Sequence, residues 1–173
     1  MAEFRKILIA NRGEIAIRVM RAANEMGKST VAIFAEEDKL SLHRFKADEA
    51  YKIGEGLGPV ASYLNIKEII SVAKKAEVDA IHPGYGLLSE KPEFAKECGL
   101  AGIKFIGPTA ESMEKLGNKA NARKIAEKAG VPVIPASNIL PDNSEEHVKI
   151  AKNIGFPLML KASWGGGGRG MRL

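Results

Sequence analysis

A run of glycines near the end of the sequence is its strongest local sign of chemistry. Residues 165–170 read GGGGRG, and Lys161 lies just before the run, at the end of the apolar stretch 158–160. Each ordered glycine costs about 0.5–1 kcal/mol relative to alanine, which is expensive for a simple turn. Backbone N–H groups in such a loop can approach an anion closely, and Lys161 can point toward the same anion. We interpret the segment as an anion-binding cover. A flexible linker and a strand-end lysine that reaches solvent stay open as alternatives.

Two glycine patterns mimic nucleotide-binding fingerprints but lack the structural context that these need. The glycines at 165, 167 and 170 match G-x-G-x-x-G, yet the following residues, 171–173, read as a strand rather than a helix. At the first strand–helix junction, where a dinucleotide fingerprint belongs, residues 10–14 (ANRGE) contain one glycine. Residues 27–30 (GKST) resemble the end of a P-loop, but they join a helix to a strand, the reverse of P-loop order. The sequence therefore disfavours a Rossmann oxidoreductase.

A second candidate segment, residues 82–90 (HPGYGLLSE), directly follows a short apolar run. Ligands of open α/β sheets bind at the carboxyl ends of strands, so His82 and Tyr85 are placed where a ligand is expected. A structural and a catalytic role both stay open for His82. The chain has three histidines in all, and we expect no metal site in it.

Short apolar runs alternate with helix-period segments, the pattern of βα units around a parallel sheet. The expected strands are at 6–10, 30–35, 49–53, 79–82 and 103–106. The expected helices between them are at 13–26, 65–76 and 92–101. The apolar face of the first helix is expected to hold Ile15, Val19, Ala23 and Met26.

After residue 108 the regular alternation of strands and helices ends. Helices are expected at 119–129 and 144–154, each followed by a glycine, with an extended segment at 131–135 between them. A strand at 157–162, the glycine run and residues 171–173 read as a β-hairpin whose second arm is cut short. We therefore expect the chain to be a fragment of a longer protein.

Composition narrows the class of protein. Hydrophobic residues make up 45% and charged residues 27%, as in soluble globular proteins. The net charge of +5 comes from scattered basic residues without an arginine-rich run or zinc-finger spacing, so no nucleic-acid partner is expected. No apolar stretch approaches the roughly 18 residues of a membrane helix. The single cysteine, Cys98, suits a reducing compartment, and we expect a cytoplasmic protein.

Several segments, taken together and in order, resemble the biotin carboxylase family. They are residues 9–16 (IANRGEIA), 47–50 (ADEA), 62–64 (SYL), 80–86 (AIHPGYG), 105–108 (FIGP), 161–163 (KAS) and 170–172 (GMR). The resemblance implies an α/β fold, with a Rossmann-like doubly wound parallel sheet, the pre-ATP-grasp domain, over residues 1–117. A linker helix and the start of an ATP-grasp lid are implied over residues 118–173.

The resemblance also implies an ATP-dependent ligase. In that family ATP activates bicarbonate to carboxyphosphate, and the carboxyl group passes to N1′ of biotin, which a separate carrier domain holds. By its motifs, the resemblance implies that Lys119 and Lys161 bind the nucleotide phosphates, that Gly167 and Gly168 cover them, and that Met159 and Met171 line the adenine pocket. It also implies that Tyr85 lies near biotin and bicarbonate. The dimer surface that it implies carries Arg18, Arg21 and Glu25. The family's Mg²⁺ ligands and catalytic groups lie beyond residue 173. No residue here is therefore expected to be catalytic, and the fragment alone is expected to be inactive.

Two segments narrow the resemblance further. Residues 43–49 (HRFKADE) and 161–165 (KASWG) look more like pyruvate carboxylases than acetyl-CoA carboxylases, although Trp164 departs from the glycine or leucine that is commoner there. Pyruvate is thus the expected carboxyl acceptor, with an acetyl-CoA or propionyl-CoA carboxylase as the alternative. A non-catalytic nucleotide-sensing or assembly module is the alternative from another class. The intact protein is expected to be a homo-oligomer without a membrane partner.

Overall fold

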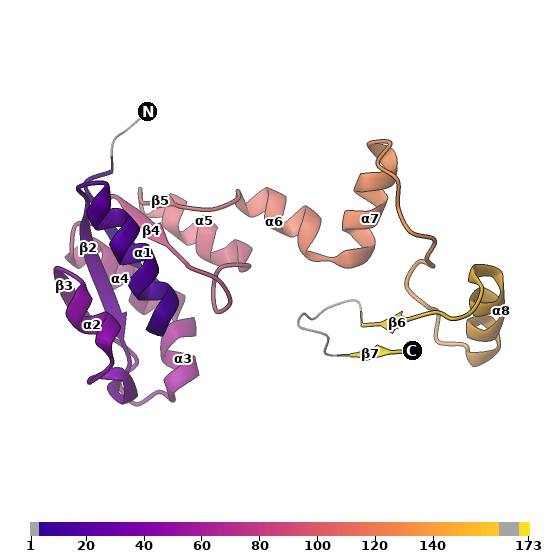
Figure 1. Cartoon of the computed structure of the whole chain (residues 1–173), viewed down its shortest axis with the longest axis horizontal. Coiled ribbons are helices and arrows are strands. Elements are labelled where there is room, and N and C mark those ends of the chain that lie inside the picture. Colours follow the sequence, from indigo (N-terminus) through magenta and orange to yellow (C-terminus); the bar gives the residue numbers. More distant parts are fainter. Residues whose placement is uncertain (1–3, 163–169) are drawn as a thin grey trace. The chain divides into compact units, whose positions relative to one another are not determined.

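The computed structural model describes residues 4–162 and 170–173 of the chain, which divides into two compact units (Figure 1). Unit 1 comprises Met1–Met113, and unit 2 comprises Glu114–Leu173. The domain boundary at residue 117 that the sequence predicted stays a prediction. Among the described residues, no helix combines the length and the hydropathy needed to cross a bilayer.

Unit 1 is built on a five-stranded sheet with the order β3-β2-β1-β4-β5, and every neighbouring pair is parallel. Its strands are β1 (Lys6–Ile9), β2 (Ser29–Phe34), β3 (Glu49–Lys52), β4 (Ala80–His82) and β5 (Lys104–Phe105). The chain runs outward from β1 to β3 and then returns to the other side of β1 with β4. The boundary between β1 and β4 is therefore the topological switch point, where ligands of open α/β sheets bind.

Helices pack on both faces of this sheet. They are α1 (Gly13–Glu25), α2 (Leu42–Lys46), α3 (Pro59–Leu64), α4 (Ile66–Lys75) and α5 (Pro92–Leu100). Successive strand residues point to opposite faces. Leu8 accordingly packs with Ile69 of α4 and Phe94 of α5, whereas Ile9 packs with Met20 of α1. Burial on both faces explains the near-continuous apolar strands and confirms the doubly wound parallel sheet.

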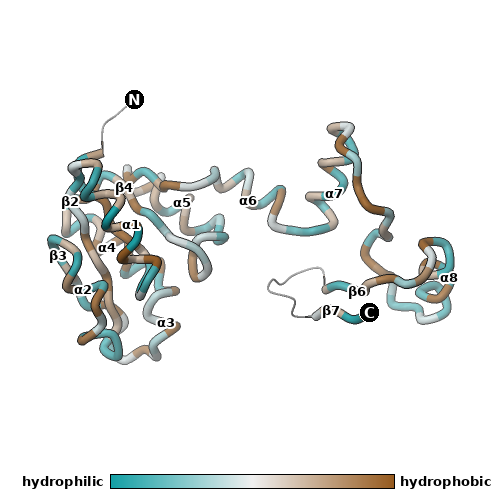
Figure 2. The backbone as a smooth tube through the Cα atoms, in the orientation of Figure 1, coloured by the Kyte–Doolittle hydropathy of each residue, from teal (hydrophilic) through white to brown (hydrophobic). Residues whose placement is uncertain are grey.

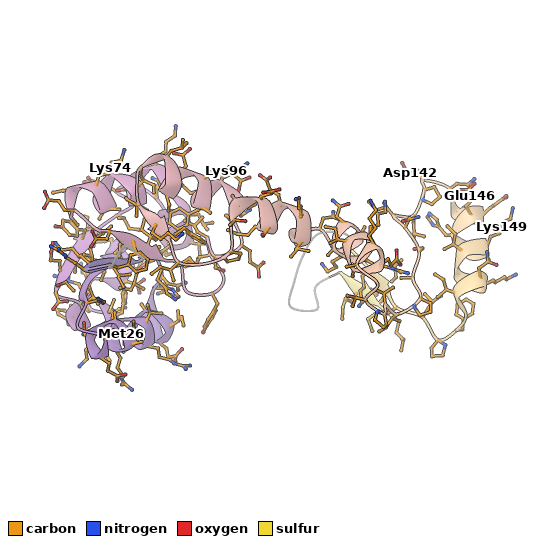
Figure 3. All side chains as sticks on the ribbon, turned by 90° about the horizontal axis from the view of Figure 1, so that it is seen from above. Met26, Lys74, Lys96, Asp142, Glu146 and Lys149 are labelled. Carbon is orange, nitrogen blue, oxygen red and sulfur yellow. The ribbon has the colours of Figure 1, made fainter. Side chains whose placement is uncertain are left out.

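The buried face of α1 differs from the expected one. The side chains of this helix that are buried belong to Ala16, Met20 and Ala23. Val19 is only half-buried, and Met26 is 70% exposed at the surface of unit 1 (Figure 3). The helix ends at Glu25, so Met26 lies in its cap and not on a further apolar turn. Of the expected residues, Ala23 is buried and Val19 packs partly buried against the core, so the expectation was wrong for Met26 and missed Ala16 and Met20.

The structure contains several short helices that the sequence analysis did not predict. Those without an expected counterpart are the 3₁₀ helix η1 (Glu36–Asp38), α2, α3 and α6 (Ala110–Gly117). Each has at most eight residues, too few for a helical period to stand out in sequence. Asn65 caps α4, because its side chain accepts a hydrogen bond from the Glu68 N–H.

Unit 2 consists of helices and one small strand pair. Its elements beyond α6 are α7 (Lys119–Lys128), α8 (Ser144–Ile154), β6 (Leu160–Lys161) and β7 (Met171–Arg172). The two helices agree with the sequence-based expectation, and the strand expected at 157–162 shrinks to two residues. β6 and β7 pair antiparallel, as the predicted hairpin requires. Within the described part of unit 2, no hydrophobic side chain is fully buried.

Candidate functional site

The switch point of unit 1 brings two sequence motifs together. In the parallel register Ile9 lies opposite His82, so the chain leaves β1 and β4 at the same edge of the sheet. The Ala10 N–H then donates to the His82 carbonyl at 2.9 Å and extends the pairing by one residue. Residues 11–12 and 83–85 consequently lie side by side, although about 70 residues separate them in sequence.

Asn11 ties these two loops together with its side-chain amide. Its Nδ2 donates to the carbonyl oxygens of Pro83, at 2.7 Å, and Tyr85, at 3.0 Å. Its Oδ1 accepts a hydrogen bond from the Arg12 N–H at 2.9 Å. Gly84 has a φ of +66°, and a Cβ there would lie 2.6 Å from Asn11 Nδ2, so only glycine fits between the two carbonyls. Asn11 is buried, with 3% of its surface exposed.

His82 and Tyr85 serve different purposes at this edge. The Nδ1 atom of His82 accepts a hydrogen bond from the Gly84 N–H at 2.9 Å, and burial lowers the pKa of His82. The neutral His82 ring holds the loop that follows it, which fits a structural role. The sequence had left both a structural and a catalytic role open. Tyr85 is 65% exposed, so its ring is accessible to a ligand. Its place near biotin and bicarbonate stays a prediction.

A cluster of polar side chains around the buried carboxylate of Asp38 lies next to this site, and the sequence did not predict it. Arg12 Nε and Nη2 donate to the two carboxylate oxygens of Asp38, at 2.6 and 2.5 Å. The Tyr63 hydroxyl donates to Asp38 at 2.7 Å and accepts from the Ala35 N–H at 3.2 Å. Ser41 Oγ donates to Asp38 at 2.8 Å. The loops after β1 and β2 and the helix α3 are therefore joined through one side chain.

Charge pairing in this cluster fixes its protonation state. The hydrogen bonds from Arg12, ahead of those from Tyr63 and Ser41, hold the pKa of Asp38 well below its usual range. Asp38 in turn raises the pKa of the Arg12 guanidinium. Burial, followed by the bond to Asp38, raises the pKa of the Tyr63 phenol. None of the three groups exchanges a proton near neutral pH, so the cluster holds the edge of the sheet and does not act as an acid or base.

Three of the predicted nucleotide residues of unit 2 lie in or next to its strand pair: Met159, Lys161 and Met171. Lys161 lies directly opposite Met171, and such antiparallel partners project to the same face. The Ala162 N–H donates to the Gly170 carbonyl at 3.0 Å, which closes the pair beside the predicted glycine run. Met159 immediately precedes β6 and is 48% exposed. Gly167 and Gly168 lie outside the described residues.

The remaining predicted residues lie on helices. Lys119 is the first residue of α7, directly after Asn118, whose side chain caps the helix by accepting from the N–H groups of Ala120 and Asn121. Arg18 forms an exposed i,i+4 ion pair with Glu14, at 3.5 Å. Exposed side chains of α1 include those of the predicted dimer surface, Arg18, Arg21 and Glu25. Their role in a dimer stays a prediction.

The described residues do not fit a Mg²⁺ site or a reactive thiol. No cluster of three or more histidine, cysteine, aspartate or glutamate side chains occurs in residues 4–162 and 170–173. We therefore assign no ligand for Mg²⁺ in this part of the chain. Cys98 is completely buried in α5, and burial raises the pKa of its thiol to about 12, which makes it an inert core residue.

Comparisons with known protein families match both units. Residues 3–113 match the biotin carboxylase N-terminal domain, and residues 118–173 match the ATP-binding domain of the carbamoyl-phosphate synthase L chain. A pyruvate carboxylase of Staphylococcus aureus is 57% identical over the whole chain. The chain spans only 15% of that relative's length.

Solved structures agree in fold as well as in sequence. A Rhizobium etli pyruvate carboxylase, determined with its allosteric activator acetyl coenzyme-A, is 62% identical with a TM-score of 0.91, over 99% of this chain and 15% of its own. The biotin carboxylase domain of a Hydrogenobacter thermophilus 2-oxoglutarate carboxylase, in complex with MgADP, ADP and bicarbonate, is 48% identical. Its TM-score is 0.93, over 99% of this chain and 38% of its own.

Proposed function

We propose a function from the premise that this chain belongs to the biotin carboxylase family: it supplies the first domain and part of the nucleotide lid of an ATP-dependent ligase. In the proposed reaction, bicarbonate attacks the γ-phosphorus of ATP, which releases ADP and gives carboxyphosphate. The carboxyl group then passes to N1′ of biotin on its carrier domain, the bond between the carboxyl carbon and the phosphate oxygen breaks, and the released phosphate takes up the proton that N1′ loses. Mg²⁺ neutralises the phosphates when it is bound.

The observation that carries this proposal is the pairing of Lys161 with Met171. A cation directly opposite an apolar thioether, on one exposed face, offers contacts both to phosphate and to a nucleotide base. Lys119, at the start of α7, is the second proposed phosphate contact, and Met159 is the second proposed base contact. Gly167 and Gly168 are proposed to cover the phosphates.

In unit 1 the proposal assigns Tyr85 to the biotin and bicarbonate vicinity. The support is its exposed ring at the switch-point edge, where ligands of open α/β sheets bind. Asn11 already fills the gap between the β1 and β4 loops, where a dinucleotide-binding fold places a pyrophosphate. This observation weighs against the alternative oxidoreductase.

The carboxyl acceptor that we propose is pyruvate, which would yield oxaloacetate. The identities to pyruvate carboxylases and the segments at 43–49 and 161–165 support pyruvate over acetyl-CoA or propionyl-CoA. We further propose a cytoplasmic homo-oligomer whose subunits meet at the exposed face of α1 that carries Arg18, Arg21 and Glu25. Neither a nucleic acid nor a membrane is part of the proposal.

The test is the substitution Lys161→Gln in a complete carboxylase that contains this chain. Loss of a charge-assisted contact should weaken ATP binding by about ten- to a hundredfold. The dissociation constant of ATP would be measured by calorimetry, and the rate of phosphate release with biotin and bicarbonate would be followed in parallel.

Lys149→Gln provides the matched control, because Lys149 is an exposed lysine of α8 (Figure 3). We expect this variant to bind ATP within about twofold of the unmodified enzyme. An unchanged dissociation constant for Lys161→Gln would leave Lys161 as a solvent-exposed strand residue. The proposed nucleotide site would then be wrong.

A further inference from the structure

The hydrogen bonds of Asn11 reach beyond its own loop and define the backbone that carries Tyr85. The two acceptors of its Nδ2 are the carbonyl oxygens of Pro83 and Tyr85, on either side of Gly84. A single side chain thus holds two carbonyl groups of the loop, on either side of Gly84. Asn11 is almost fully buried, so its bond to the Pro83 carbonyl is shielded from water, and its bond to the Tyr85 carbonyl is partly shielded.

The amide chemistry of Asn11 cannot be replaced by its nearest isostere. Two carbonyl oxygens face the same atom, so that atom must be the NH₂ group, and Oδ1 is already used by the Arg12 N–H. A carboxylate at this position would turn acceptors toward both carbonyls and repel them. The hydrogen bond from the Gly84 N–H to His82 Nδ1 is local to residues 82–84 and does not tie this loop to the loop after β1.

We propose that Asn11 is a positioning residue, which holds residues 83–85 in the conformation that presents the Tyr85 ring to biotin. This inference rests on the proposed function only in naming biotin as the ligand. Asn11 lies behind the loop and does not touch the substrate. Its loss should therefore weaken the use of biotin and leave the use of ATP unchanged.

The kinetic test uses Asn11→Asp in a complete carboxylase that contains this chain, with free biotin as the substrate. We expect the KM for biotin to rise by about tenfold or more, as for the loss of one or two buried hydrogen bonds. The KM for ATP should stay within about twofold. Asn11→Ser removes the bridge without adding a negative charge, and it serves as the second variant if Asn11→Asp does not fold.

The matched control is Asp79→Asn at the opposite edge of the same sheet. The Asp79 carboxylate also makes two hydrogen bonds to neighbouring backbone, accepting from the N–H groups of Arg5 and Lys6 at 2.8 Å each. Its isosteric change should lower stability and leave the KM for biotin unchanged. Equal increases in both KM values for Asn11→Asp, or no increase, would overturn the positioning role.

A second measurement separates this inference from the proposed function. Amide hydrogen exchange in the 173-residue chain should become faster at Arg12 and Gly84 in Asn11→Asp and in Asn11→Ser, while Lys6 and Ala10 keep their protection. If the unmodified carboxylase fails to carboxylate biotin, the proposed function is wrong. Faster exchange confined to the two loops would still support the positioning of Tyr85, and unchanged exchange would refute it.

Discussion

Unit 1 and unit 2 both contain hydrophobic side chains but differ in how far these side chains are buried. Unit 1 buries its hydrophobic residues on both faces of a five-stranded sheet. Hydrophobic stretches also occur in unit 2, including the extended segment after α7 (Figure 2). Among the described residues of unit 2, however, Ile134 is 86% exposed and Phe156 is 72% exposed.

This difference shows that hydrophobic residues form a core only where the secondary structure gives them a broad surface to pack against. The strands of unit 1 give the helices two broad faces to pack against, whereas β6 and β7 of unit 2 have two residues each. The helices of unit 2 depend on local contacts, such as the Asn118 cap and the Arg123–Glu127 ion pair at 2.8 Å. We therefore expect the proposed nucleotide contacts to lie on elements that open more easily than the sheet of unit 1.

Core substitutions should separate the two units most strongly. Ile33→Ala removes a fully buried side chain from the centre of unit 1. We expect it to lower the free energy of unfolding by about 3–4 kcal/mol, from lost transfer energy and the cavity left behind. Ile134→Ala makes the same chemical change at an exposed position of unit 2 and should stay within about 0.5 kcal/mol. Urea denaturation followed by circular dichroism measures both. Similar losses would mean that unit 2 has a core of its own.

Ion pairs provide a second, smaller contrast. Asp38→Ala leaves the buried Tyr63 hydroxyl and the Arg12 guanidinium without their shared partner. We expect a loss of about 2–3 kcal/mol, less than for a fully buried pair because the Arg12 side chain is 51% exposed. Glu127→Ala breaks the exposed i,i+4 pair of α7 and should cost less than about 0.5 kcal/mol. The same urea titrations apply, and equal costs would contradict the structural role of the Asp38 cluster.

The doubly wound sheet was predictable because its signal is long and repetitive. Strands buried on both faces read as continuous apolar runs, and the expected strands agree with β1 to β5 within about two residues at each end. The biotin carboxylase resemblance was confirmed by the match over residues 3–113. The buried face of α1 was predicted only in part. Ala23 and the half-buried Val19 lie on it, whereas Ala16 and Met20 were missed and the exposed Met26 was wrongly included.

The candidate site was predictable in its location and not in its contacts. Asn11 and Arg12 belong to a recognised motif, but the partners of Asn11 are more than 70 residues away in sequence. Asp38 lies in the short 3₁₀ helix η1 after β2, where the sequence pattern favours a solvated charge, and only the fold brings Arg12 and Tyr63 to it. The roles of the predicted ATP-binding residues stay predictions.

Buried histidine gives unit 1 a pH dependence at mildly acidic pH. His43 is fully buried, with Nε2 at 3.2 Å from the Ile33 carbonyl oxygen and no hydrogen-bond partner at Nδ1. Burial lowers the pKa of His43, against a smaller opposing effect of the Ile33 carbonyl and Asp38. Below the unfolded pKa of about 6.5, His43 binds a proton more readily in the unfolded chain than in the folded chain. Stability must therefore fall as the pH falls through this range.

The smallest predicted effect is this loss of stability as the pH falls. Between pH 7 and pH 5.5, each such histidine should remove at most about 1 kcal/mol from the stability of unit 1, the limit reached when the folded histidine stays neutral throughout. The lowered pKa of His82 acts in the same direction, so His43→Gln should abolish only part of the slope. Carboxylates such as Asp38 contribute mainly below about pH 5, because the unfolded pKa of aspartate is near 3.9. His147→Gln, in α8 of unit 2, is the control and should leave the slope of unit 1 intact. Urea titrations at both pH values measure the slope, and an unchanged slope in His43→Gln would mean that His43 accepts a proton without disturbing the fold.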